Sequence, residues 1–152
     1  MNPELSTILK TAPPPVQATV LGSNILVVVD MQMGFAAALE PWLLDAVEAE
    51  VRRANQDSWS IVALEFLCAN PLRFYGDTHD RVVDAARTRK EKADDPQRFF
   101  MRAKAQMDGS ERVLDVCLKE GYQPQLFRVC GVKSRACVEA TAVGLATRFP
   151  RS

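Results

Sequence analysis

Hydrophobic residues along the chain form short continuous runs that alternate with stretches of helical spacing. The clearest run is ILVVV at residues 25–29, which is rich in β-branched residues and shows no alternation with polar ones. Such a run is typical of a parallel strand that is buried on both faces of a sheet. On this basis we predict four strands, at residues 25–29, 59–66, 98–102 and 125–130.

Four helices are predicted between and after these strands. Apolar residues repeat at intervals of three and four over residues 43–54, and charged residues occupy the other side. Pro41 suits the first turn of that helix, Ser110 is the expected N-cap of a later one, and Gly121 is its expected stop. In the last helix, Thr141 falls on the face expected to be buried. The predicted helices cover residues 41–54, 78–89, 110–120 and 135–148.

Strands that alternate with helices predict an α/β fold, here a Rossmann-like three-layer α/β/α domain with a mostly parallel sheet. We assign residues 24–152 to this domain and residues 1–23, which hold three consecutive prolines and no regular period, to an N-terminal arm. Right-handed crossovers bring the carboxyl ends of the strands to one edge, where such sheets bind ligands. The residues of interest are therefore Asp30 after the first strand, Lys104 after the third, and residues 131–137 after the fourth.

Composition narrows the class of function. Nineteen basic and nineteen acidic residues leave no net charge at pH 7, so there is no electrostatic reason to expect nucleic acid or a membrane as partner. No apolar run approaches the roughly 18 residues of a membrane span, and the N-terminus lacks the pattern of a secretory signal. The four cysteines show no disulfide or zinc spacing, and His79 is the only histidine. We expect a cytoplasmic protein with reduced thiols and without a histidine-rich metal centre.

The carboxyl edge of the predicted sheet brings together residue types that suit nucleophilic chemistry. Cys137 is expected at the start of a helix, where unpaired N–H groups and the helix dipole lower the pKa of a thiol. A nearby lysine would lower that pKa further, and an aspartate could take the thiol proton. Spacing alone leaves the alternative open, since a buried cysteine is often only a small hydrophobic residue.

Two stretches of sequence resemble known motifs. VVVDMQMGF at residues 27–35 resembles the VVxDMQxxF opening of the isochorismatase-like cysteine hydrolases. CGVKSRACVEATA at residues 130–142 resembles the second signature of that family, a GVxxxxCVxxTA run. The motifs occur in the family's order and after the corresponding strands, and the resemblance covers about residues 25–150.

The resemblance implies an Asp-Lys-Cys triad. Asp30 matches the acid–base carboxylate, Cys137 the nucleophile, and Lys104 the lysine that ends the third strand. It also implies a cis peptide bond between Val132 and Lys133, which would turn the Lys133 N–H inward to form an oxyanion hole with the Cys137 N–H. The implied reaction is hydrolysis of an amide-type C–N bond of a small-molecule substrate through a thioester on the cysteine, without a cofactor.

The chain departs from the family pattern in its middle part. Nicotinamidase-type members carry an Asp-x-His metal motif after the second strand, whereas residues 65–70 read EFLCAN, so no metal is expected. Glu65 is a candidate substrate-binding residue, and its alternative role is a hydrogen bond at the rim. Phe35 is a second candidate substrate contact, because it matches the first motif and lies at the ligand-binding edge.

The chain is also shorter than the family pattern. Members usually continue past the nucleophile helix with further strands and helices, whereas this sequence ends at Ser152. The fourth strand would then be an edge with unpaired backbone groups, which favours pairing with another chain. We therefore expect either a truncated member or a homo-oligomer.

Three classes of function remain open. The first is a cysteine amidohydrolase, and the second is a catalytically inactive binding or assembly module that keeps the α/β frame. The third is a flavodoxin-like binder of nucleotides or phosphate. That class calls for a glycine-rich loop after the first strand, and residues 31–35 contain only Gly34.

Overall fold

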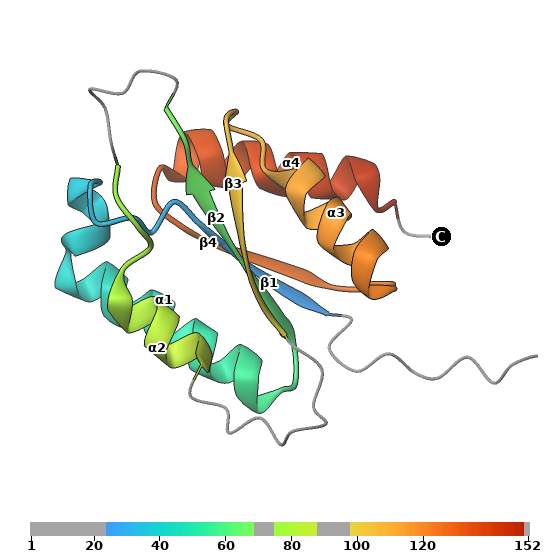
Figure 1. The fold of residues 1–152 in the computed structure, drawn as a ribbon, viewed down its shortest axis with the longest axis horizontal. Coiled ribbons are helices and arrows are strands. Elements are labelled where there is room, and N and C mark those ends of the chain that lie inside the picture. The colour runs from blue at the N-terminus through green and yellow to red at the C-terminus, as the bar shows by residue number, and fades with distance from the viewer. Residues whose placement is uncertain (1–23, 69–74, 88–97, 151–152) are drawn as a thin grey trace, which may run out of the picture.

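A computed structural model describes residues 24–68, 75–87 and 98–150 of the chain. Its centre is a parallel four-stranded sheet with the strand order β3-β2-β1-β4 (Figure 1). The strands are β1 (Ile25–Val29), β2 (Ser60–Phe66), β3 (Phe99–Lys104) and β4 (Phe127–Gly131). The predicted parallel sheet and its four strands are confirmed, and β4 lies at an edge of the sheet.

Helices cover both faces of the sheet, as the three-layer prediction requires. One face carries α1 (Pro41–Gln56) and α2 (Asp80–Arg87), and the other carries α3 (Ser110–Glu120) and α4 (Glu139–Arg148) (Figure 1). Two short turns adjoin the carboxyl edge of the sheet: the 3-10 turn η1 (Ala36–Leu39) and the π-helical turn η2 (Ser134–Val138). Within the described ranges, no helix is long and apolar enough to cross a membrane.

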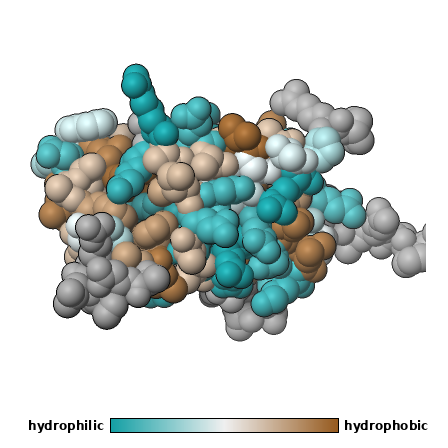
Figure 2. All heavy atoms as spheres, turned by 90° about the horizontal axis from the view of Figure 1, so that it is seen from above, coloured by the Kyte–Doolittle hydropathy of each residue, from teal (hydrophilic) through white to brown (hydrophobic). Residues whose placement is uncertain are grey.

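The core consists of two apolar clusters, one on each face of the sheet. Successive residues of β1 contribute to the two clusters in turn: Leu26 and Val28 pack in the cluster of α1 and α2, and Val27 and Val29 pack in that of α3 and α4. Every residue of β1 is buried. The continuous apolar run therefore reflects a central strand with helices on both sides. Seen from above, the molecular surface mixes hydrophilic and hydrophobic side chains (Figure 2).

Several predicted boundaries were wrong by a few residues. Lys104 is the last residue of β3 and pairs with Phe66, whereas the strand was expected to end before it. Ser110 lies inside α3, whose N-cap is Gly109, because the Asp108 side chain accepts the Ser110 N–H and takes over the capping role. Gly121 ends α3 in the left-handed conformation, with φ 70°, as predicted. The predicted arm, residues 1–23, lies outside the described residues.

Gln32 joins separate segments at the carboxyl edge of the sheet. Its side-chain amide donates to the carbonyl oxygens of Phe66, at 3.2 Å, and Gly76, at 2.8 Å, and its Oε1 accepts the Phe66 N–H at 2.6 Å. The side chain is buried, so these backbone groups depend on it for their hydrogen bonds. Gln32 therefore fixes the end of β2 against the chain that leads into α2.

Replacing Gln32 tests this role. We expect Gln32→Leu to lower the free energy of unfolding by about 2–4 kcal/mol, because it leaves three partly buried backbone hydrogen bonds without their side-chain partner. Urea denaturation measures the change. The same substitution at the exposed Gln123 is the control and should change stability by less than about 0.5 kcal/mol. Equal effects of the two substitutions would contradict the role given to Gln32.

Candidate active site

Asp30 follows β1 directly and lies at the centre of the carboxyl edge, because β1 is flanked by β2 and β4. Its side chain is fully buried, and its backbone N–H donates to the Leu64 carbonyl at 3.0 Å. Its φ of 53° is in the left-handed region, which is uncommon for a residue other than glycine. Such conformations persist where the surroundings enforce them, and they gather at functional sites.

Lys104 reaches Asp30 from the other side of β2. Its Nζ lies 3.2 Å from each carboxylate oxygen of Asp30 and donates to the Gln106 carbonyl at 3.1 Å. The ammonium also lies 4.8 Å from the centroid of the Phe66 ring, at the end of β2. With only 2% of the lysine side chain and none of the aspartate side chain exposed, this is a buried ion pair that spans three strands.

Cys137 completes the cluster from the turn η2. The Lys133 carbonyl accepts the N–H groups of both Ala136 and Val138, which folds η2 and presents the buried Cys137. Asp30 and Lys104 are the two charged side chains that lie close enough to shift the pKa of this thiol. The structure thus brings together the three residues that the sequence predicted to meet.

The predicted lowering of the thiol pKa was wrong. Burial raises the pKa of Cys137 above its ordinary value, and the hydrogen bond and negative charge of Asp30 raise it further; Lys104 opposes both effects without cancelling them. The prediction assumed a partly exposed thiol at a helix N-terminus, whereas Cys137 is buried in η2, before α4 begins. The thiol is therefore protonated at neutral pH in the free protein.

The predicted cis peptide bond between Val132 and Lys133 was also wrong, since none of the described peptide bonds is cis. The chain turns instead through Lys133, whose φ of 59° is left-handed, and keeps the trans peptide that is favoured by about 3–4 kcal/mol. Val132 is buried and donates its N–H to the Val29 carbonyl at 3.1 Å. An oxyanion hole formed by the Lys133 and Cys137 N–H groups stays a prediction.

Phe35 and Glu65, the two candidate substrate contacts, both have partners within the protein. The Phe35 ring stacks on Tyr75 with 4.3 Å between ring centroids, and the Lys133 ammonium lies 5.0 Å from its centroid. Glu65 Oε1 accepts the N–H of Thr78 at 2.9 Å and its hydroxyl at 2.8 Å. Glu65 therefore makes the rim hydrogen bond that was its alternative role. Substrate contact by either residue stays a prediction.

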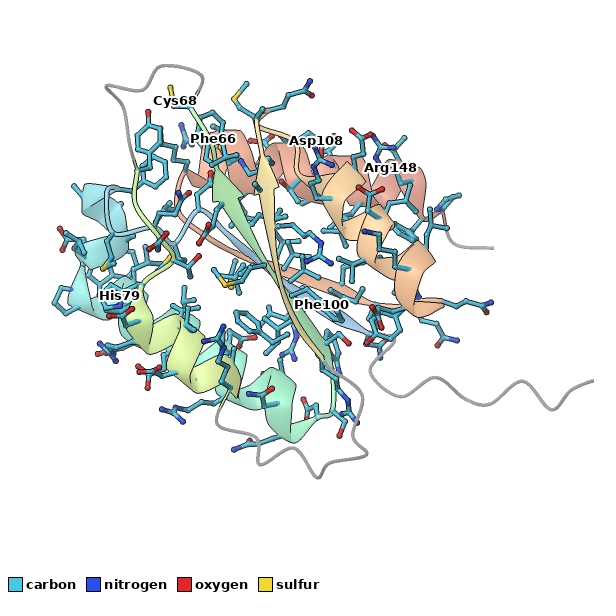
Figure 3. The ribbon with its side chains drawn as sticks, in the orientation of Figure 1. Phe66, Cys68, His79, Phe100, Asp108 and Arg148 are labelled. Atoms are coloured by element: carbon cyan, nitrogen blue, oxygen red, sulfur yellow. The ribbon has the colours of Figure 1, made fainter. Side chains whose placement is uncertain are left out.

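Potential metal ligands do not gather in this site. No group of three or more His, Cys, Asp and Glu side chains in the described part of the chain could hold a metal ion. His79 lies at the start of α2, where its Nδ1 accepts the Arg81 N–H at 3.2 Å. Figure 3 shows it on the α2 side of the sheet, away from Asp108 and Arg148.

The sequence predicts for Thr141 only a place on a buried helix face, whereas the structure gives it a supporting role at the site. Thr141 hydrogen-bonds the loop between β3 and α3, the loop that follows Lys104. The hydroxyl on an otherwise apolar face, four residues after Cys137, was the only sequence signal for such a role.

Breaking the buried ion pair should be costly. We expect Lys104→Met to lower the free energy of unfolding by about 3–5 kcal/mol, because it leaves the Asp30 carboxylate buried without its cation. Adding Asp30→Asn should recover part of that loss, since the double variant buries no charge at the pair. Urea denaturation of both variants checks this, with Lys119→Met on the exposed part of α3 as control. Strictly additive losses would argue against a coupled pair.

The pKa of Cys137 can be followed by alkylation with iodoacetamide and peptide mass spectrometry. The midpoint of labelling with pH should lie above about 8.5, the ordinary value for a thiol. Asp30→Asn should lower the midpoint because it removes a negative charge, and Lys104→Met should raise it because it removes a positive one. Cys117, whose pKa burial raises to about 11, is the internal control and should label alike in every variant. A wild-type midpoint below 8 would contradict this account.

Solved structures of known proteins share the fold. A ribonuclease, MAR1 from Caenorhabditis elegans, matches with a TM-score of 0.64 and 18% identity over 87% of this chain and 62% of its own. A nicotinamidase from Staphylococcus aureus matches with a TM-score of 0.63 and 22% identity over 84% of this chain and 76% of its own. The N-carbamoylsarcosine amidase from Thermoplasma acidophilum gives a TM-score of 0.58 and 19% identity over 84% and 78%.

No family model and no curated protein matches the sequence. The chain spans less than two thirds of the length of the C. elegans ribonuclease. Further structures with the same fold are described as isochorismatase-family proteins. At these identities the likeness establishes the fold: this chain has the α/β fold of isochorismatase-family proteins, as its two sequence motifs implied.

Proposed function

We propose that this chain is an isochorismatase-like cysteine hydrolase that cleaves an amide-type C–N bond of a small molecule. The observation that carries the proposal is the buried cluster of Asp30, Lys104 and Cys137, formed by residues from three separate parts of the chain. The fold supports it, because structures that share it include a nicotinamidase and an N-carbamoylsarcosine amidase.

The first step is attack by Cys137 on the carbonyl carbon of the substrate. The resting thiol is neutral, so its proton must leave as the C–S bond forms. Asp30 is the base within reach. Its Oδ1 accepts no well-aligned hydrogen bond from the described residues, although the Lys104 ammonium is 3.2 Å away. That oxygen is available for the thiol proton.

The carbonyl electrons move to the oxygen, and we assign its stabilisation to the backbone N–H groups of Lys133 and Cys137, the oxyanion hole predicted from the sequence. As the C–N bond breaks, the proton held by Asp30 passes to the nitrogen, and ammonia or an amine leaves. Water then attacks the thioester and gives a proton to Asp30. The C–S bond breaks, the acid product leaves, and the proton returns to the sulfur.

Lys104 supports these steps without exchanging protons. Its ammonium compensates the buried carboxylate and lowers the pKa of Cys137 against the raising effects of burial and Asp30. The Gln106 carbonyl and the Phe66 ring hold it in place. The ion pair therefore balances the negative charge of the proposed base inside the protein.

We further propose a cytoplasmic protein that self-associates. Cys68, Cys117, Cys130 and Cys137 are all free thiols, as expected in a reducing compartment. Among the residues that the structure describes, β4 pairs with β1 alone and lies at the edge of the sheet. An edge strand offers backbone groups to a second copy of the chain.

The experiment is a screen of small amides for ammonia release. We expect turnover with at least one amide, and a loss of at least about a thousandfold in Cys137→Ser, since the serine hydroxyl is a far weaker nucleophile in this setting. Mass spectrometry of quenched reactions should find an acyl group on Cys137. Cys68→Ser is the matched control and should retain activity.

Two outcomes would contradict the proposal. Ammonia release that survives in Cys137→Ser would place the chemistry elsewhere. The absence of both turnover and acylation across the screen would favour a catalytically inactive binding module with the same fold.

A further inference from the structure

The loop between β3 and α3, residues 105–109, is hydrogen-bonded to α4 through Thr141. The Thr141 Oγ1 accepts the Gly109 N–H at 3.0 Å and lies 3.4 Å from the Met107 carbonyl, to which it donates. The side chain is fully buried. Water therefore cannot replace the hydroxyl as a partner of the loop, and the position of the loop depends on Thr141.

Two further contacts join the same loop region to the same face of α4. Gly144 lies so close to Asp108 that a Cβ at this position would be 2.5 Å from its Oδ1. One turn later, the Arg148 Nε donates to the Ser110 hydroxyl at 2.9 Å. Figure 3 shows Asp108 and Arg148 on the α3–α4 side of the sheet. Residues 141, 144 and 148 follow helical spacing, so one face of α4 contacts the loop and the start of α3.

The two ends of this connection are residues of the candidate active site. At one end, the Lys104 ammonium donates to the carbonyl of Gln106 in the same loop. At the other end, Thr141 is four residues after Cys137, one helical turn along the segment formed by η2 and α4. The loop therefore carries a group that orients the ammonium, and Thr141 fixes the loop relative to the segment that carries the thiol.

We infer that Thr141 is a positioning residue, whose hydroxyl sets the distance between the Lys104 ammonium and the Cys137 thiol by holding the intervening loop. The role rests on the proposed function only in that the thiol is the nucleophile. Without the hydroxyl, the Gly109 N–H loses its acceptor, the loop shifts, and the ammonium moves away from the sulfur. Asp30 and Lys104 are the charged groups that act on this thiol, and they shift its pKa in opposite directions. When the ammonium moves away, the raising effect of the Asp30 carboxylate is opposed less, and the pKa of Cys137 rises.

A purely structural role for Thr141 predicts a different result. If the hydroxyl served only to pack α4 against α3, its loss would lower stability and leave the pH dependence of Cys137 unchanged. A positioning role alters that pH dependence and lowers kcat with little effect on KM, because the ammonium acts on the reacting thiol and on its base.

The test compares Thr141→Val with Thr141→Ser in the full chain. Valine matches the shape of threonine but cannot accept the Gly109 N–H, whereas serine keeps the hydroxyl. The matched control is Thr147→Val, which removes an exposed hydroxyl of α4 that donates to the Val143 carbonyl at 3.0 Å. Iodoacetamide labelling of Cys137 is followed against pH, and the melting temperature is recorded for each variant.

We expect Thr141→Val to raise the labelling midpoint of Cys137 by about one pH unit, which is a roughly tenfold lower rate at neutral pH. Thr141→Ser and Thr147→Val should keep the wild-type midpoint. With an amide that the wild type hydrolyses, Thr141→Val should lower kcat at least about tenfold. If Thr141→Val does not fold, Thr141→Ala removes the same hydroxyl, and the same shift is expected.

A wild-type midpoint in Thr141→Val, or a serine variant that behaves like the valine variant, would overturn the inference. The labelling result does not require turnover. A shifted midpoint in a protein that hydrolyses no amide would therefore support the positioning role while contradicting the proposed function. Amide hydrolysis by the wild type, together with an unchanged labelling midpoint and an unchanged kcat in Thr141→Val, would support the proposed function and contradict the positioning role.

Discussion

The buried ion pair between Lys104 and Asp30 is the interaction on which the rest of the site depends. Both charged side chains are buried, so each has lost its hydration by water. The opposite charge 3.2 Å away compensates that loss. The pair exists because β2 lies between β1 and β3, and because the register places Lys104 beside Phe66 at the end of β2. A slip of one residue in β3 would turn the lysine to the opposite face of the sheet and leave the carboxylate alone. The register of three strands therefore determines the electrostatics of the site.

This arrangement also determines the state of the thiol. Burial and the carboxylate keep Cys137 protonated, and the lysine does not reverse their effect. A resting thiolate would add a second negative charge to a buried cluster that holds a single cation. In the reaction we propose, proton transfer to Asp30 during attack avoids that charge, because the number of anionic groups stays constant as the sulfur loses its proton. The raised pKa is thus compatible with nucleophilic chemistry when base and nucleophile are held together.

The sequence predicted the sheet and the meeting of the three residues because both depend on patterns that are local in sequence. ILVVV indicates a strand buried on both faces, and the two motifs follow the ends of strands whose carboxyl ends share an edge.

The features that the sequence did not predict depend on contacts between distant segments. The pKa of the Cys137 thiol is raised by burial and by Asp30, which is 107 positions away in the sequence. The backbone turns at Lys133 because that residue adopts a left-handed conformation, and the peptide bond stays trans. The contact between Thr141 and Gly109 joins residues 32 positions apart, and no periodicity encodes it.

The fold alone does not determine which reaction a protein catalyses, since structures that share this fold include a ribonuclease, a nicotinamidase and an N-carbamoylsarcosine amidase. The charge of the cluster is more informative. Asp30, Lys104 and a neutral Cys137 sum to zero, so the three residues provide no surplus cation. A phosphodiester brings a negative charge and develops another in the transition state, which calls for arginine, lysine or a metal directed at the phosphate. An amide is neutral and develops a single negative charge on one oxygen, which backbone N–H groups can hold. A neutral cluster with a thiol beside its base therefore suits an acyl centre better than a phosphate.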